Sequence, residues 1–194
     1  MVSVLPHSII YLTFGDDFNQ DVSELPPFLT HLIFGSGFNK DVMTLPQTLT
    51  YLVFGYAFNH DISKLPEGIT HLALGYKFNQ CCNIPTNIKY LTLNCNNMHI
   101  INSLPNSIVE LELEYEFYSR IDNLPTSIKK LKIDKYGCYD ADLNSLPDFI
   151  EELQLNSSYT KQLIHIPSNL KKIICNRNYP HINDFASYDV EFYN

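Results

Sequence analysis

A leucine-proline or isoleucine-proline pair recurs about every 20 residues, and this period constrains the fold more than any other feature of the chain. An aliphatic residue follows each proline by three positions, and a leucine or isoleucine follows three positions later. The prolines lie at positions 6, 26, 46, 66, 85, 105, 125, 147 and 167. The chain therefore consists of about nine copies of one short unit.

One unit cannot fold alone. Its L-x-x-L-x-L spacing ends in an alternation typical of a short strand, with both leucines on one face. Six buried apolar side chains at ~2–3 kcal/mol each do not offset roughly 30 kcal/mol of ordering cost for such a unit. Stacked copies share their apolar faces, so their strands align in parallel. The sequence predicts a leucine-rich-repeat solenoid with a parallel β-sheet on the concave face, a mostly irregular or 3₁₀ convex side, and little α-helix.

The first four repeats carry a sharper signature, which reads FGDDFN at 14–19, FGSGFN at 34–39, FGYAFN at 54–59 and LGYKFN at 74–79. These segments resemble the FNIP, or FGxxFN, repeats, a leucine-rich-repeat family of social amoebae and giant DNA viruses of protists. The resemblance is specific over residues 1–83, whereas only the leucine frame and the proline persist over 84–175. We expect residues 1–175 to form the array and 176–194, which drop the repeat but stay aromatic, to form a C-terminal cap.

The signature residues have structural explanations. A glycine after each strand suits a turn that needs positive φ or close approach of two backbones. The asparagines lie where the chain leaves the sheet, and we expect them to form a buried ladder. The phenylalanines should form two aromatic rows inside. These structural positions are Phe14, Gly15, Phe18, Asn19, Phe34, Gly35, Phe38, Asn39, Phe54, Gly55, Phe58, Asn59, Gly75, Phe78 and Asn79.

Residues that flank the core leucines point out of the sheet, and their character changes midway along the chain. The first five repeats alternate tyrosine and histidine, and the later ones alternate glutamate and lysine. Such a face is either a docking surface or a set of ladders that only stabilises the sheet, and the second explanation is favoured for the charged rows. The candidate partner-binding residues are Tyr11, His31, Ile33, Tyr51, Val53, His71, Tyr90, Glu110, Glu112, Lys130, Lys132, Glu152 and Lys172.

Composition and motifs argue against nucleic-acid binding, membrane association, metal binding and catalysis. A net charge of −8 disfavours nucleic acid and anionic membranes, and no window suits a membrane span or a secretion signal. His31 and His71 lie two strands apart, roughly 10 Å, which is too far to share a zinc ion. Cys81, Cys82, Cys95 and His99 match no standard metal spacing. We therefore expect no catalytic residue, cofactor or metal, and no enzyme.

The main functional prediction is an intracellular module, in the cytoplasm or in the host cytoplasm if viral, that binds an unidentified protein through its concave face. Five unevenly spaced cysteines favour a reducing compartment. The family resemblance implies recruitment to ubiquitin ligases, although Met1–Val4 leave no room for an F-box-like segment or a cap. The alternative is a structural solenoid that self-associates as a homodimer through exposed N-terminal repeats. An enzyme is a distant third.

Overall fold

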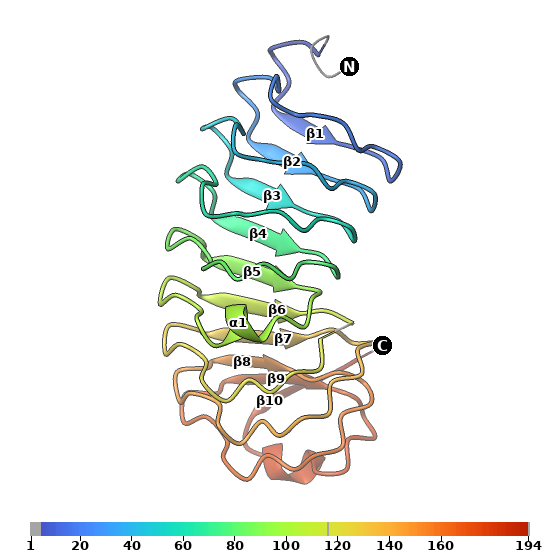
Figure 1. Ribbon diagram of the computed structural model, residues 1–194. Helices are drawn as coiled ribbons and strands as arrows, with labels where there is room; N and C mark the ends of the chain where they lie inside the picture. Colours follow the sequence, from blue (N-terminus) through green and yellow to red (C-terminus); the bar gives the residue numbers. More distant parts are fainter. Residues whose placement is uncertain (1–4, 116, 194) are drawn as a thin grey trace.

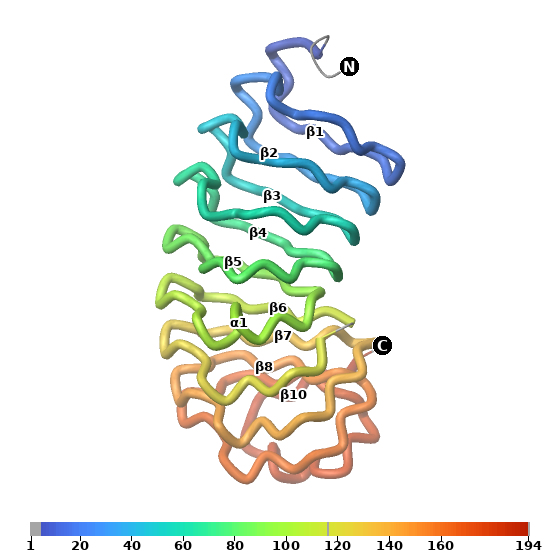
Figure 2. The backbone as a smooth tube through the Cα atoms, viewed as in Figure 1, coloured from blue at the N-terminus to red at the C-terminus, as the bar shows by residue number. Residues whose placement is uncertain are grey.

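The computed structural model describes residues 5–115 and 117–193, which wind into a stack of similar coils (Figures 1 and 2). Each coil contributes one strand to a ten-stranded parallel sheet in the order β1 to β10. The strands are β1 Tyr11–Thr13, β2 His31–Ile33, β3 Tyr51–Val53, β4 His71–Leu74, β5 Tyr90–Leu93, β6 Glu110–Leu113, β7 Lys130–Ile133, β8 Glu152–Gln154, β9 Lys172–Cys175 and β10 Asp189–Phe192. The expected leucine-rich-repeat solenoid is confirmed.

Strand register keeps equivalent residues side by side throughout the array. Leu12 is opposite Leu32, and the same column continues without a slip through the repeats of unequal length. The 19-residue step pairs Leu72 with Leu91, and the 22-residue step pairs Leu131 with Leu153. Extra or missing residues are therefore absorbed in the turns, because a one-residue slip in a strand would turn its leucines out of the core.

Helical structure is sparse, as the short repeat predicts. The helix α1 spans Met98–Ile101, and the 3₁₀ segment η2 spans Ile182–Phe185. Asn97 caps α1, because its side-chain oxygen accepts hydrogen bonds from the backbone N–H groups of His99 and Ile100 at 3.1 and 3.3 Å. Its amide nitrogen donates to the Gln80 carbonyl in the preceding coil at 3.0 Å. A side-chain cap thus also joins two coils.

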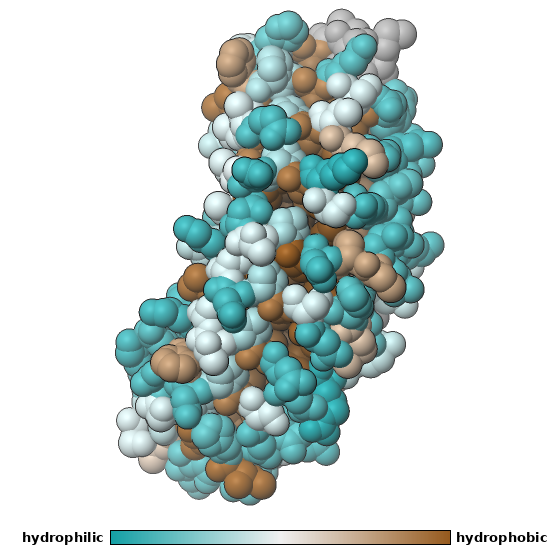
Figure 3. All heavy atoms as spheres, turned by 60° about the vertical axis from the view of Figure 1, so that its left-hand side comes forward, coloured by the Kyte–Doolittle hydropathy of each residue, from teal (hydrophilic) through white to brown (hydrophobic). Residues whose placement is uncertain are grey.

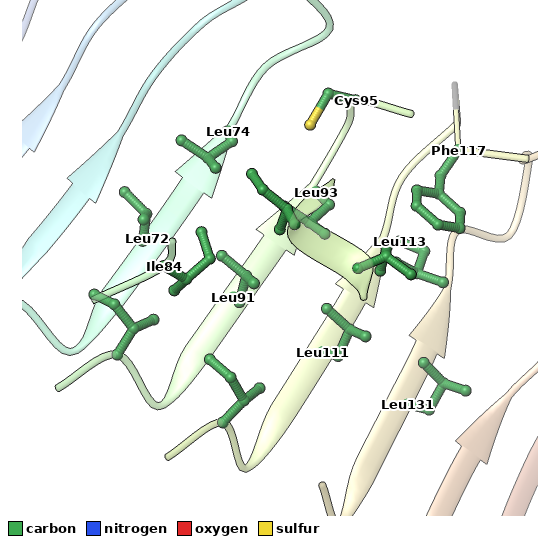
Figure 4. Close-up of a cluster of buried hydrophobic side chains, with 14 of the residues drawn as sticks. Leu72, Leu74, Ile84, Leu91, Leu93, Cys95, Leu111, Leu113, Phe117 and Leu131 are labelled. Atoms are coloured by element: carbon green, nitrogen blue, oxygen red, sulfur yellow. The ribbon is translucent and has the colours of Figure 1, made fainter. Parts of the chain in front are cut away.

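The core runs as continuous rows between the sheet and the opposite wall (Figure 4). Leucines of β4 to β7 project from the strands, whereas Ile84 and Phe117 come from the segments across the coil. All of these side chains are at most 2% exposed, so neighbouring coils exclude water from the rows between them. Stability therefore depends mainly on contacts between adjacent coils.

Phenylalanines of the first repeats form two stacked columns. Within a coil the two rings lie 3.7 Å apart in the Phe34–Phe38 pair, and between coils Phe34 and Phe54 lie 5.6 Å apart. Buried Asn97 interrupts the Phe18–Phe78 column in the fifth coil. Aromatic pairs recur in the later coils, where Phe117 lies 6.1 Å from Tyr139 and Tyr159 lies 6.1 Å from Tyr179. Aromatic packing is therefore present beyond the FGxxFN segments, but not as one unbroken column.

The asparagine ladder is present, but the prediction that it is buried was wrong. The side-chain oxygen of Asn19 accepts a hydrogen bond from the backbone N–H of Asn39 at 2.9 Å. The side-chain oxygen of Asn39 accepts one from the backbone N–H of Asn59 at 3.0 Å. Asn19, Asn39 and Asn79 are exposed to solvent. The amides satisfy backbone donors at the surface, where each coil leaves the neighbourhood of the sheet.

The two ends of the array differ. At the C-terminal end, Tyr179 and Phe185 are buried, and β10 adds a tenth strand in register with β9. This segment therefore extends the sheet and packs against the end of the core. At the other end Phe14 and Phe18 are only half-buried, and the described residues provide no strand on the outer side of β1. Met1 to Val4, on which the expectation of an uncapped start rested, lie outside the described residues.

The side of the solenoid that carries the turns before the strands is largely hydrophilic, with hydrophobic side chains visible in a line along it (Figure 3). No helix within residues 5–115 and 117–193 has the length and hydrophobicity needed to cross a membrane.

Close backbone contact explains the glycine that follows the strand, since no described glycine has a positive φ. A Cβ at Gly35 would lie 2.5 Å from the carbonyl carbon of Gly15 and 2.6 Å from its oxygen. A Cβ at Gly15 itself would meet nothing within 4 Å. Glycine at position 35 thus lets the second coil approach the first.

We predict that Gly35→Ala lowers the free energy of unfolding by about 1–3 kcal/mol, because the coils must move apart to admit the methyl group. Gly15→Ala is the matched control, and it should leave the value unchanged or raise it by up to about 1 kcal/mol. Urea denaturation of the two variants measures the difference. Equal stability of the two variants would contradict the close-contact explanation.

Candidate functional site: the outer face of the sheet

The aromatic ladder consists of Tyr11, His31, Tyr51, His71 and Tyr90, which lie side by side on β1 to β5. Their ring centroids are separated by 4.3, 5.4, 5.6 and 4.1 Å in that order. Tyr11 at the start is 64% exposed, and Tyr90 at the end is 40% exposed. The ladder thus presents a continuous strip of ring edges to solvent.

Threonines fix the two histidine rings. Thr30 and Thr70 each place a hydroxyl 2.9 Å from Nδ1 of the histidine that follows. The Thr30 hydroxyl also donates to the Ile10 carbonyl at 3.0 Å, which leaves its oxygen to accept from Nδ1 of His31. Burial lowers the pKa of His71 below its ordinary value of 6.5, and the positive charge of His31 lowers this pKa further, whereas Glu110 raises it. His71 is therefore neutral at pH 7.

Charged side chains follow on β6 to β9, and most of them form ion pairs with one another. We call this set the charged ladder; it consists of Glu110, Glu112, Lys130, Lys132, Glu152 and Lys172. Lys132 is ion-paired with Glu110, and Lys130 lies 3.1 Å from Glu152. Beside the strands, Glu151 forms ion pairs with Lys129 at 3.1 Å and with Lys171 at 2.7 Å. Lys172 pairs with Glu191 of β10 at 2.8 Å. Such exposed pairs contribute little stability each, but they leave few free charges on this half of the face.

A hollow of about 260 Å³ lies where the two ladders meet. Ala73 makes it possible, because this small residue lies between Val53 and Thr92 in the outward-facing row. Its lining combines rings, small side chains and two carboxylates, and it contains no lysine or arginine. We call this the junction hollow; it is lined by Tyr51, Leu52, Val53, His71, Leu72, Ala73, Tyr90, Thr92, Glu110 and Glu112.

A second depression, of about 440 Å³, adjoins it over the charged ladder. Tyr90 and Glu110 line both depressions, so the two are neighbours on one surface. Lysines and glutamates form the rest of its lining, including Lys129, Lys171 and Glu151 beside the strands. The outer face is therefore hollowed across its middle, over β3 to β9.

Comparison with known proteins bears on this architecture. The family model of the FNIP repeat matches residues 21–57 and 81–116. This chain contains FNIP repeats. The second match lies mostly beyond residue 83, so the FNIP repeats extend past the segments that carry FGxxFN, where only the leucine frame was expected.

One solved structure similar to this FNIP-repeat chain is described as that of CroV588, a novel circular leucine-rich-repeat protein. The sequences are 30% identical, the TM-score is 0.70, and the match covers 90% of this chain and 32% of that one. The chain thus spans about a third of that protein's length. No curated protein matches the chain at a significant level.

Nine of the thirteen predicted face residues line the junction hollow or the adjoining depression. Tyr51, Val53, His71, Tyr90, Glu110 and Glu112 line it, whereas Lys130, Glu152 and Lys172 line the adjoining depression. Tyr11, His31, Ile33 and Lys132 lie on the same outer face but line neither. Strand register along the repeat array therefore brings these candidates together.

Sequence reasoning missed Ala73 and Thr92 as site residues, although both belong to the outward-facing row. The sequence did contain a signal, because Ala73 and Thr92 are small residues in a row whose other members from repeat two onward are Ile, Val, Glu, Lys, Gln and Ile. It also missed Tyr56 and Tyr76, whose exposed rings stack at 5.1 Å on the turns after β3 and β4. The FGxxFN motif leaves those two positions variable, so nothing marked them.

The five cysteines of the chain are all free thiols. Cys95 and Cys175 are buried, and burial raises the pKa of each thiol to about 11. Such thiols are protonated at neutral pH and unsuited to act as nucleophiles. Within the described ranges, no group of three or more His, Cys, Asp or Glu side chains could hold a metal ion. Asn156, which begins a glycosylation-type triplet, is 1% exposed and so inaccessible in the folded chain.

We predict that acidification destabilises the repeat array partly through His71. Because its folded-state pKa is lowered, the unfolded chain takes up the proton first as the pH falls through about 6.5, and stability is lost below that pH. Replacing His71 with Tyr removes this titration and keeps a ring in the ladder. Urea midpoints between pH 7.5 and 5.5 should therefore fall less in His71→Tyr than in the wild type.

His31→Tyr is the matched control, because it makes the same replacement in the same ladder at a position away from the hollow. It should retain most of the wild-type pH dependence. An equal loss of pH dependence in the two variants would contradict the assignment to His71.

Proposed function

We propose that the chain is a protein-interaction module that docks a partner on the outer face of its sheet, centred on the junction hollow, and that it is not an enzyme. The observation that carries this proposal is the hollow itself, which interrupts the ladders where aromatic and acidic side chains meet. Ladders that only stabilise a sheet need no such interruption. Tyrosine is also enriched at the centres of protein interfaces, because it combines apolar area with a polar tip.

The dimensions of the hollow favour a side chain of a protein over an independent small molecule. Its volume of about 260 Å³ lies below the ~300–1,000 Å³ of most small-molecule sites. The charged depression beside it widens the surface that a protein could cover. The free thiols favour a reducing, intracellular setting for this docking. Recruitment to ubiquitin ligases is suggested by the family resemblance alone, and the proposal does not depend on it.

Blocking the hollow tests the proposal. Ala73→Arg introduces a long side chain into the hollow at a solvent-facing position, so the fold should be retained. Affinity capture from cell lysate would compare this variant with the wild type at matched folded concentration, checked by circular dichroism. We expect at least one protein to be retained by the wild type and reduced by tenfold or more with Ala73→Arg.

The control is Asn106→Arg, which adds the same charge at an exposed turn residue outside the strands. It should capture the same proteins as the wild type. Identical capture by all three forms would refute docking on this face.

The N-terminal end of the described sheet supports a second candidate, a structural solenoid that self-associates. Phe14 and Phe18 are half-buried, and β1 is the edge strand of the described sheet. Phe14 donates its N–H to Ile33 at 2.9 Å, so by alternation the Thr13 N–H points to the unpaired side. Exposed edges of this kind pair readily with a second copy.

Light scattering over the micromolar range distinguishes this second candidate from a monomeric module. Self-association predicts a mass near twice that of one chain, and Thr13→Pro should reduce it to the mass of one chain by removing the outward N–H donor. A wild-type mass of one chain throughout the range would eliminate the homodimer.

A further inference from the structure

The junction hollow holds an uncompensated negative charge. Of the glutamates within β6 to β9, Glu110 is paired with Lys132 and Glu152 with Lys130. Glu112 has no ion pair among the residues that the structure describes, although it lies directly opposite Lys132 in the register. Two carboxylates and one ammonium group thus leave this part of the face with one net negative charge.

Lys132 offsets part of the charge of Glu112 from the next strand, but a further carboxyl group adds to it. Glu114 follows β6, and its pKa is raised by burial first and then by the negative charges of Glu112 and Asp134. The residues that line the hollow include no lysine or arginine, and its one histidine, His71, is neutral at pH 7. A cation that enters the hollow therefore meets attraction from Glu112 without a competing positive charge in the lining.

The aromatic ladder ends at this same point. Tyr90 stacks on His71 at 4.1 Å, and the next residue in the column is Glu110, which has no ring. One face of the Tyr90 ring is therefore left without an aromatic neighbour, and none of the described lysines or arginines covers it. A flat cation can stack on a tyrosine face while it contacts a carboxylate beside it.

We propose that the junction hollow binds an arginine side chain presented by an extended segment of a protein partner. This inference rests on the proposed docking function and adds the chemistry of its central contact. The guanidinium group forms a hydrogen-bonded ion pair with Glu112 and stacks on the outer face of Tyr90. The aliphatic stem of the arginine lies over Ala73 and Val53, where a larger residue than alanine would exclude it.

A pair of short peptides tests this assignment. The probes are acetyl-Gly-Ser-Arg-Ser-Gly-amide and the same peptide with citrulline, which keeps the shape of arginine but carries no charge. NMR titration would follow the Tyr90 and His71 ring signals and the Thr92 amide. We expect the arginine peptide to shift these signals and to bind at least tenfold more tightly than the citrulline peptide.

Two glutamate variants locate the charge. Glu112→Gln should reduce the arginine-to-citrulline preference to about one, since it removes the unpaired carboxylate. Glu191→Gln removes the same charge from the same outward-facing row at the far end of the sheet, and it should keep the preference. Circular dichroism and urea midpoints verify that both variants are folded.

The assignment is overturned if neither peptide shifts the signals, if both bind alike, or if Glu112→Gln retains the preference. If capture of partners still depends on Ala73, such a result removes the arginine assignment and leaves the docking face in place. If capture is identical for the wild type and Ala73→Arg, the docking function fails as well.

Discussion

Contact between the backbones of successive coils sets the geometry on which the rest of the molecule depends. At the glycine after the strand, one coil rests against the carbonyl group of the coil before it, with no space for a side chain. Hydrogen bonds between parallel strands hold all the coils at a spacing of ~4.8 Å, and glycine lets the first four coils reach this spacing at the turn, so each residue faces its equivalent in the next coil. Phenylalanine columns, asparagine ladders and the tyrosine-histidine strip all follow from that repetition.

The same repetition determines what the outer face can be. A column of identical ionised residues would be repulsive, and the chain avoids this by alternating tyrosine with histidine and glutamate with lysine. Alternation satisfies each ladder internally, because a ring stacks on a ring and an ammonium group pairs with a carboxylate. Between β5 and β6 the tyrosine-histidine alternation changes to glutamate and lysine, and there the stacking of rings and the pairing of charges are both incomplete. Tyr90 has a ring on one side only, and Glu112 has no ion pair among the described residues.

Much of the architecture could be predicted from the sequence because the repeat period carries it. The strand positions, the buried leucine rows and the scarcity of helix followed from proline and leucine spacing, and the structure confirms them. Burial of Asn19 and Asn39 could not be judged in the same way, since a period shows that residues are equivalent but not which side of a turn they occupy. The period does not place Tyr139 either, because the 22-residue repeat puts this aromatic residue two positions further from its strand than Phe117 and Tyr159 are from theirs.

The junction hollow was beyond prediction in a different sense. Each of its residues belongs to a row that the sequence identified, yet the hollow depends on relative sizes across three strands. Ala73 creates space only because Val53 and Thr92 flank it, and Tyr51, His71 and Tyr90 form a wall beside it. The proposed docking site therefore lies where the repetition is broken. A ladder that continued unchanged through β5 and β6 would cover its own rings and charges, and would leave a partner little to recognise.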